Sequence, residues 1–371
     1  MKREKMKLAD ENNPLLAIGL MSGTSFDGVD AALIISDGEN KIECGQGITL
    51  DYPISVKHKL RNIKSAGLSE LIEIEDEITH LHIEAVKEVL KLNNLKAEEV
   101  QLIGFHGQTV IHIPEKHLTW QIGNPSLLAY KTRINVISDF RRKDLAAKGL
   151  GAPLVPIFHK AIAANLAKPC AILNIGGVAN ITYIDQDELI AFDTGFGNAP
   201  IDDLLNKRLD IEYDKGGQIA FSGKVDDGIV NKFLVHDYFS KLPPKALDRN
   251  AFDFSFLESM TTEDGAASLG AIIAETVKSG ISLLPKKPLH LYVCGGGRKN
   301  KFIMKCLSDL LGIKVTSIEE IIIEGKPLNG DLIEAYAFGY LAVRSHKNLY
   351  ISFPTTTSSR HPVVGGVFCR A

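Results

Sequence analysis

Short apolar runs along the chain predict β-strands, and the first two form a pair. Residues 15–20 and 29–35 are apolar, and residues 22–28 between them are rich in glycine, serine and aspartate. Turn-forming residues between two apolar runs are typical of a β-hairpin. A second hairpin is predicted at residues 171–175 and 178–184, which two glycines separate. We therefore expect two antiparallel strand pairs, each with a glycine-containing tip.

Apolar residues at helical spacing alternate with these strands. They repeat every three or four positions over residues 78–92, which predicts a helix. Further helices are predicted at residues 302–310, at residues 331–344 and after Asp264, whose side chain is a suitable N-cap. Three more short strands are predicted at residues 102–105, 134–137 and 289–294. This alternation predicts an α/β protein.

The length of the chain predicts two domains. A chain of 371 residues exceeds the usual size of one core, and two domains imply a cleft between them. Arginine, lysine, glycine and proline interrupt the apolar periodicity at residues 140–151. We predict an N-terminal α/β domain over residues 1–140 and a C-terminal one over 141–344, with residues 345–371 packing back onto the first.

Composition narrows the possible partners. Hydrophobic residues make up 45% of the chain, charged residues 23%, and the net charge is −3, as in an ordinary globular protein. Arg141, Arg142 and Lys143 form a basic cluster, but Asp139 and Asp144 flank it, so no nucleic-acid partner is expected. The cysteines are five, scattered and unpaired in spacing, which argues against disulfides and zinc. No signal peptide or membrane span is evident, so a cytoplasmic protein is expected.

Three glycine-rich segments suit a nucleotide. Residues 19–30 combine glycines and small hydroxyls, whose donors fit phosphate oxygens, with Asp27 and Asp30, which would need Mg²⁺ beside a phosphate. An ordinary hairpin turn explains this segment equally well by itself. Gly176 and Gly177 form a second such tip, and two phosphate-compatible tips are harder to explain as plain turns. The third segment, residues 295–297, follows a strand and precedes a helix, and it suits the adenosine better than a dinucleotide.

Polar residues at predicted strand ends are candidates for acid–base chemistry and substrate binding. Asp193 follows an apolar run, which suits a general base, although an Asx turn is an equal alternative. His106 and Gln108 follow a strand and could meet a sugar, or could serve the structure alone. Arg142 could bind a carboxylate or phosphate, or form a salt bridge at the domain boundary. His106 and His112 have no neighbouring cysteine, so a zinc site is not expected.

An ordered series of motifs resembles the anhydro-N-acetylmuramic acid kinases. The resemblance extends over residues 18–344. Its segments are GLMSGTSFDGVD (19–30), FHGQT (105–109), DFRR (139–142), GAPLVP (151–156), NIGGVAN (174–180), FDTGFGN (192–198), DKGG (214–217), CGGG (294–297) and EAY (334–336). The resemblance implies a two-domain actin-like, ribonuclease H-like sugar kinase fold with an ATP site in the interdomain cleft.

The resemblance also implies an activity. Water would open the 1,6-anhydro bridge, and phosphorylation of O6 by ATP would give N-acetylmuramic acid 6-phosphate and ADP, in peptidoglycan recycling. Asp193 would be the base that activates water. A homodimer is expected on the same ground.

The resemblance assigns residues to each ligand. Those implied for ATP are Gly23, Thr24, Ser25, Phe26, Asp27, Gly28, Val29, Asp30, Gly176, Gly177, Gly295, Gly296 and Gly297. Those considered for the sugar are His106, Gln108, Arg142 and Glu334. Asp27 and Asp30 would hold Mg²⁺, directly or through water.

Two departures and two rival functions stay open. Phe196 stands where the family usually has proline, which could loosen the turn beside Asp193, and the tail over residues 353–370 is atypical. A conventional sugar kinase would use the same ATP motifs and direct Asp193 at a free hydroxyl. An actin-like ATPase would use its cleft as a switch, but the chain has no room for the usual partner-binding segments.

Overall fold

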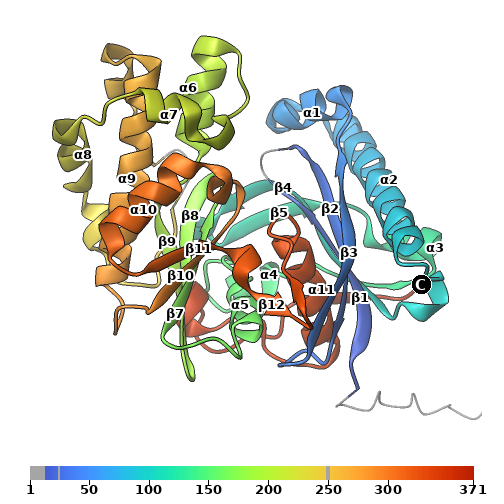
Figure 1. The fold of residues 1–371 in the computed structure, drawn as a ribbon. Helices are drawn as coiled ribbons and strands as arrows, with labels where there is room; N and C mark the ends of the chain where they lie inside the picture. The colour runs from blue at the N-terminus through green and yellow to red at the C-terminus, as the bar shows by residue number, and fades with distance from the viewer. Residues whose placement is uncertain (1–12, 24–25, 248–250) are drawn as a thin grey trace, which may run out of the picture. The chain divides into compact units, whose positions relative to one another are not determined.

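The computed structural model describes the chain in three stretches, residues 13–23, 26–247 and 251–371. Contacts divide the chain into two compact units, whose elements are labelled in Figure 1. Unit 1 comprises Met1–Gly151, Leu332–Ser352 and His361–Ala371, and unit 2 comprises Ala152–Asp331 and Phe353–Arg360. Each unit contains a β-sheet covered by helices, so the predicted α/β class is confirmed.

Unit 1 is built on a mixed sheet. β1 and β2 form an antiparallel hairpin in which Leu15 pairs with Ser36, so the first predicted hairpin is confirmed. β1 and β6 pair with β4 in parallel, and β14 pairs antiparallel with β6. The order is β14-β6-β4-β1-β2-β3, with β5 on β4. The strands are β1 (Leu15–Ser22), β2 (Gly28–Ser36), β3 (Ile42–Asp51), β4 (Leu102–Ile113), β5 (Leu118–Ile122), β6 (Asn135–Ser138) and β14 (Val367–Cys369).

Helices cover both faces of this sheet. Ile18 and Leu20 of β1 share a hydrophobic cluster with Ile78 of α2, whereas Gly19 lies against Ala335 of α11. Because successive strand residues point to opposite faces, α2 and α11 lie on opposite faces. The helices are α1 (Ile54–Arg61), α2 (Leu68–Leu92), α3 (Pro125–Thr132), α4 (Arg142–Ala146) and α11 (Ile333–His346). The predicted helix at residues 78–92 is therefore confirmed and begins earlier, at Leu68.

The placement of α11 differs from the sequence-based domain boundary. We assigned residues 331–344 to the second domain, whereas the helix packs on β1, β2 and β4 of unit 1. It approaches the strands closely because glycine leaves no side chain between them. A Cβ atom at Gly19 would overlap the carbonyl oxygen of Ala335, and one at Gly104 would overlap that of Phe338. The order of elements along the chain does not show that this helix packs against the sheet of unit 1.

Unit 2 has its own sheet, in the order β11-β10-β7-β8-β9. β7 and β8 form the second predicted hairpin, in which Cys170 pairs with Ile184, so that prediction is also confirmed. β10 pairs in parallel with β7 and with β11, and β9 lies at the edge beside β8. The strands are β7 (Cys170–Ile175), β8 (Val178–Asp185), β9 (Glu188–Phe196), β10 (His290–Cys294) and β11 (Lys314–Ser317), with a separate pair β12 (Ile322–Ile323) and β13 (Lys326–Pro327).

A long helix, α9, organises the helical layer of unit 2, where it packs against α6, α7, α8 and α10. Its N-cap is Thr261, whose hydroxyl accepts the N–H of Asp264. The predicted cap at Asp264 was wrong, because the helix begins one turn earlier. The helices are α5 (Pro156–Ile162), α6 (Ala199–Leu209), α7 (Gln218–Ser222), α8 (Asp227–Leu234), α9 (Thr262–Ser282), α10 (Lys301–Leu311), α12 (Pro354–Thr357) and the 3₁₀ helices η5 (Asp237–Ser240), η7 (Gly296–Lys299) and η8 (Ile318–Glu320).

Replacement of Gly19 tests the contact between α11 and β1. Gly19→Ala should lower the free energy of unfolding of unit 1 by about 3 kcal/mol, because strand and helix must separate to admit a methyl group. Trp120 is the only tryptophan and lies in β5, so its fluorescence during urea unfolding reports on unit 1. Gly67→Ala is the matched control, since a Cβ atom there meets nothing within 4 Å. Equal stability of the two variants would contradict the prediction.

Candidate functional site

Asp193 lies inside strand β9, and a distant segment binds it on three sides. Its N–H donates to the carbonyl of Lys245 at 2.9 Å, and its carbonyl accepts the hydroxyl of Tyr238 at 2.7 Å. Its carboxylate Oδ2 accepts the N–H of Leu247 at 2.8 Å. The strand continues to Phe196, so Asp193 does not stand at a strand end, and the carboxylate does not cap a turn of its own.

The surroundings of Asp193 favour a proton acceptor. Burial raises the pKa of the Asp193 carboxyl group to about 7, while the N–H of Leu247 acts in the opposite direction. A carboxyl group with a pKa near neutrality can both hold and release a proton at physiological pH. The geometry and the ionisation therefore suit the general base that we predicted at Asp193.

Phe196 extends β9 and fixes its end. The ring is buried and packs edge-on against Phe233, Phe252 and Phe254, at centroid distances of 5.4, 6.2 and 5.2 Å. Such aromatic contacts stabilise a fold beyond the area that they bury. The residue that departs from the family pattern thus anchors the strand beside Asp193 in a hydrophobic cluster.

The two glycine segments of unit 2 lie together. A Cβ atom at Gly295 would overlap Asn174, and one at Gly297 would overlap the Ile175 side chain, both at the end of β7. By contrast, a Cβ atom at Gly176 or Gly177 would meet no atom closer than 3.7 Å. Neither of these two glycines has a positive φ angle. The packing of the protein does not require glycine at Gly176 and Gly177, so the space beside them is open to a ligand.

Arg298 fixes the segment that includes Gly295 and Gly296. Its guanidinium group donates to the carbonyl of Gly295 at 2.9 Å, to Glu319 at 2.8 Å and to Asp331 at 2.9 Å. The Arg298 side chain is only 5% exposed, whereas the Glu319 and Asp331 side chains are 39% and 49% exposed, so the ion pairs run from a buried guanidinium group to the surface. Residues 295–297, which we predict to contact adenosine, are therefore held in place by the hydrogen bonds and ion pairs of Arg298, the residue that follows them.

The loop between β1 and β2 holds the other predicted phosphate ligands, and Thr24 and Ser25 lie outside the described residues. The N–H of Phe26 donates to the carbonyl of Gly23 at 3.3 Å. Asp27 is exposed, and the side chain of Val29 is buried in the core of unit 1. Because the Val29 side chain is buried, Val29 could contact an anion only through its main chain.

Gly28 and Asp30 are both engaged by β3. A Cβ atom at Gly28 would overlap the carbonyl of Leu50, so close strand pairing requires glycine there. Asp30 Oδ1 accepts the hydroxyl of Thr49 at 2.6 Å. Asp30 is therefore held at the start of β2, close to the loop.

Two carboxylates, Asp27 and Asp30, are the candidates for a metal. Among the residues that the structure describes, no group of three or more histidine, cysteine, aspartate or glutamate side chains could enclose a metal ion. Mg²⁺ in nucleotide sites is usually held by one or two carboxylates together with phosphate oxygens and water. Asp27 and Asp30 supply two carboxylates of the kind that this pattern uses, one exposed on the loop and one at the start of β2.

Gln108 supports the loop. The side chain is fully buried; its amide nitrogen donates to the carbonyl of Gly23 at 2.9 Å, and its amide oxygen accepts the hydroxyl of Tyr52 at 3.3 Å. Ser22 donates to the carbonyl of Gly107 at 3.1 Å nearby. Gln108 thus links β4 to the β1–β2 loop, and its amide is occupied by protein groups.

His106 is a buried neutral histidine. Its Nε2 accepts the Arg141 Nε–H at 3.0 Å, so Nδ1 carries the proton and donates to the carbonyl of Gly107 at 2.7 Å. Burial and the Arg141 guanidinium lower the pKa of His106 well below its usual value. His106 is therefore fixed in one tautomer.

Arg141, and not Arg142, faces the interior of unit 1. Arg142 is exposed and pairs with Asp139 at 3.5 Å, whereas Arg141 also donates to the carbonyl of Gly151 at 2.8 Å. Burial lowers the pKa of Arg141 to about 10, and the Glu334 carboxylate opposes that shift. The sequence did not distinguish the two adjacent arginines, because they stand at the start of a five-residue helix, which is too short to show a periodicity.

Glu334 is the acidic member of this cluster. Burial and the neighbouring Asp30 raise the pKa of its carboxyl group, while Arg141 lowers it. The structure thus brings His106 and Glu334 together with Arg141 and Asp30. We define His106, Arg141 and Glu334 as the unit 1 polar cluster.

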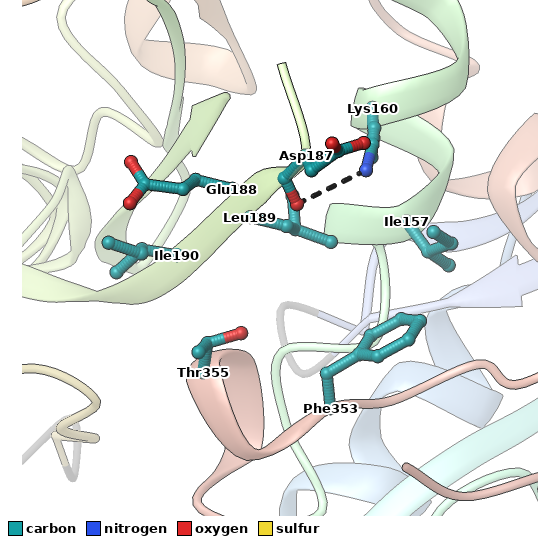
Figure 2. A pocket seen from close by; sticks show the side chains of 8 residues that line it. All are labelled: Ile157, Lys160, Asp187, Glu188, Leu189, Ile190, Phe353 and Thr355. Atoms are coloured by element: carbon teal, nitrogen blue, oxygen red, sulfur yellow. Dashed lines mark hydrogen bonds between the residues drawn. The ribbon is translucent and has the colours of Figure 1, made fainter. Parts of the chain in front are cut away.

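A separate pocket of about 330 Å³ lies in unit 2, away from the predicted residues (Figure 2). Lys160 of α5 donates to the carbonyl of Asp187 at 3.4 Å at its margin. Leu189 of β9 and Phe353 contribute apolar walls. The pocket contains none of the residues expected to bind ATP or sugar.

The length and composition of the helices also bear on whether the chain could span a membrane. Within the described stretches of the chain, none combines the length and the apolar character needed to cross a membrane.

Glycine turns and a half-buried carboxyl group on α/β units are typical of enzymes that transfer phosphoryl groups. A family model described as anhydro-N-acetylmuramic acid kinase matches residues 15–370. The chain therefore belongs to the anhydro-N-acetylmuramic acid kinase family, and it is a phosphotransferase. The resemblance found in the sequence is confirmed.

Individual relatives agree with the family model. The anhydro-N-acetylmuramic acid kinase of Zymomonas mobilis is 44% identical over 95% of this chain and 99% of the relative. That of Rhodospirillum rubrum is 39% identical over 98% of this chain and 96% of the relative. Among solved structures, a ROK family glucokinase from Streptomyces griseus in complex with glucose and AMPPNP is 12% identical, covering 88% of this chain and 99% of that chain, with a TM-score of 0.40.

Replacement of the two adjacent arginines tests the polar cluster. Arg141→Met should destabilise unit 1 by about 2 kcal/mol, because His106 Nε2 and the Gly151 carbonyl lose their donor while Glu334 stays buried. Arg142→Met should change stability by less than about 0.5 kcal/mol, since its ion pair is exposed. Urea unfolding followed by Trp120 fluorescence measures both. The reverse order of effects would refute the assignment of the buried arginine.

Proposed function

We propose that the chain is an ATP-dependent kinase that acts on 1,6-anhydro-N-acetylmuramic acid. Water opens the anhydro bridge and ATP phosphorylates O6, giving N-acetylmuramic acid 6-phosphate and ADP in peptidoglycan recycling. Family membership supports the substrate, which the relatives' names state. The observation that carries the reaction is Asp193, a half-buried carboxyl group with a pKa of about 7 and one oxygen bound by a main-chain N–H.

The proposed chemistry has two balanced steps. Asp193 takes a proton from water as the oxygen attacks C1, and the C1–O6 bond breaks. The proton that Asp193 took from water passes on to O6, which becomes a free hydroxyl group and leaves Asp193 as a carboxylate. The oxygen of this hydroxyl then attacks the γ-phosphorus as its proton is lost to Asp193 or to solvent, the bond to the β-phosphate oxygen breaks, and ADP leaves. General-base assistance is worth a factor of about 10²–10⁴ in the first step.

In unit 1 we assign the β1–β2 loop, residues 23–30, to phosphate. Donors to the phosphate would come from main-chain N–H groups, and Gln108 holds the carbonyl of Gly23 at the start of the loop. Asp27 and Asp30 would hold Mg²⁺, which neutralises phosphate charge when it is bound. Gln108 therefore acts on the nucleotide side through the loop rather than by contact with sugar.

In unit 2 we assign Gly176 and Gly177 to phosphate and residues 295–297 to adenosine. The open space beside the first two glycines supports a ligand that approaches the main chain. The Arg298 network supports a rigid surface at the second segment. A rigid surface binds a planar base with little loss of conformational entropy.

For the sugar we propose the unit 1 polar cluster, His106, Arg141 and Glu334. A guanidinium group, a neutral imidazole and a carboxyl group can recognise the carboxylate, amide and hydroxyl groups of an N-acetylated acidic sugar. Arg142 pairs with Asp139 in the structure, so we place it outside the cluster. We further propose, from the family alone, that the protein is a cytoplasmic homodimer.

Isotope labelling tests the coupled reaction. The protein is incubated with 1,6-anhydro-N-acetylmuramic acid, Mg-ATP and ¹⁸O-water, and the products are analysed by mass spectrometry. We expect label at C1 of a 6-phosphorylated product, and a loss of about 10³-fold in rate for Asp193→Asn, because the amide cannot accept the proton. Asp203→Asn, on helix α6, is the matched control and should retain activity. Phosphorylation of free N-acetylmuramic acid with an inert anhydro sugar would favour the conventional kinase.

The pH dependence follows from the Asp193 carboxyl group. Its pKa is raised from 3.8 to about 7, so the basic form is lost as the pH falls below 7. We expect kcat/KM to decline about tenfold per pH unit below pH 7 and to level off above it. Steady-state rates between pH 5 and 9, with Mg²⁺ in excess over ATP, measure the profile. A constant kcat/KM down to pH 5 would rule out a base with this pKa.

A further inference from the structure

Segment 238–247 binds the main-chain N–H, the main-chain carbonyl and one carboxylate oxygen of Asp193. β9 is an edge strand, so its outer main-chain groups need partners from outside the sheet. Lys245 accepts the Asp193 N–H, Tyr238 donates to the Asp193 carbonyl, and Leu247 donates to Oδ2. The segment therefore sets both the path of the strand and the orientation of the carboxylate.

A buried lysine holds this segment together. Lys245 is 8% exposed, and its Nζ donates to the carbonyls of Tyr238 at 3.0 Å and Phe239 at 3.3 Å, at the end of η5. Nζ also lies 4.7 Å from the centroid of the Tyr238 ring and 5.8 Å from that of Phe192, the residue before Asp193. In the described part of the chain its hydrogen-bond partners are carbonyl groups and not a carboxylate.

This arrangement requires an explanation, because a buried ammonium group without an ion pair destabilises a fold. An apolar side chain would fill the same space without that penalty. The ammonium group, however, has three N–H donors and binds the carbonyl groups of Tyr238 and Phe239 together, which holds Tyr238 where its hydroxyl reaches β9. The burial of a lysine at this position is thus explained by the two carbonyl groups that it binds.

We propose that Lys245 and Tyr238 are positioning residues for Asp193. They hold segment 238–247 against β9, so that the N–H of Leu247 occupies Oδ2 and Oδ1 is left as the oxygen that accepts the proton. This inference rests on the proposed role of Asp193 as the base. Neither residue touches the reacting atoms in this scheme.

The charged and titratable groups around Lys245 are few in the described residues. Lys241 precedes it in the same segment, Tyr238 lies on η5, and Asp193 lies on β9. Burial, assisted by Lys241, lowers the pKa of Lys245 to about 8. Lys245 is therefore mostly protonated at pH 7, near the midpoint of the Asp193 titration.

The experiment measures the ionisation of Asp193 separately from its activity. Protein labelled with ¹³C at the aspartate carboxyl carbons is titrated by NMR, with Asp193→Asn used to assign the signal. In Lys245→Met we expect the midpoint of Asp193 to rise by about 0.5 pH unit, because the N–H of Leu247 is no longer held against Oδ2. In the kinase assay kcat should fall about tenfold, with KM for ATP and for sugar unchanged within about twofold.

Two further variants separate positioning from general damage. Tyr238→Phe removes only the hydroxyl that binds the Asp193 carbonyl, so kcat should fall about threefold and the midpoint should rise by a smaller amount. If Lys245→Met does not fold, Tyr238→Phe tests the positioning proposal by itself. Lys241→Met removes an exposed positive charge four residues away and should change neither quantity.

The outcomes are distinct. A raised midpoint with a reduced kcat in Lys245→Met or Tyr238→Phe, and neither in Lys241→Met, supports the proposal. An unchanged or lowered Asp193 midpoint in both variants overturns it, whatever happens to the rate. A wild-type protein that is inert toward the anhydro sugar sinks the proposed function, and the titration still decides whether Lys245 and Tyr238 control the carboxyl group.

Discussion

The hydrogen bonds around Asp193 are the constraint on which the site in unit 2 depends. A carboxyl group within a strand loses hydration on burial, so its charged form is disfavoured unless donors replace the lost water. Leu247 supplies one such donor, and burial outweighs it, which leaves the pKa of Asp193 at about 7. More donors would yield a weak base, and fewer would leave the group protonated at neutral pH. The role proposed for Asp193 therefore depends on a carboxylate that is bound on one side only.

Unit 1 satisfies buried polar groups by a different route. His106 accepts from Arg141 and donates to a main-chain carbonyl, so each ring nitrogen has a partner and the neutral tautomer is fixed. Arg141 in turn lies close enough to Glu334 for each to shift the pKa of the other. Close packing of α11 against glycines of β1 and β4 brings Glu334 to this place. The polar cluster is thus a consequence of how tightly one helix approaches the sheet.

The sequence predicts what local pattern controls. Both hairpins and the helix at residues 78–92 follow from apolar periodicity and turn residues, and Asp193 was singled out by its position after an apolar run. The partners of Asp193 could not be found in this way, because Tyr238 and Leu247 are 45 and 54 residues away. Arg141 was missed for a local reason, since two adjacent arginines carry identical chemistry and only the packed structure separates them. The substrate was inferred from the motif resemblance, because the packing of the protein does not identify it.

The asymmetry of the Asp193 carboxylate has a mechanistic consequence. An oxygen that already accepts an N–H is a poorer proton acceptor than one that does not, because its lone pair is stabilised. Oδ2 accepts from Leu247, whereas the described residues supply no hydrogen bond to Oδ1. A water molecule activated by Asp193 should therefore lie on the Oδ1 side, and a fixed direction of approach reduces the entropy lost in reaching C1. The main chain of one segment thus orients the carboxylate and lowers its pKa, and in the proposed mechanism it also sets the side from which water approaches.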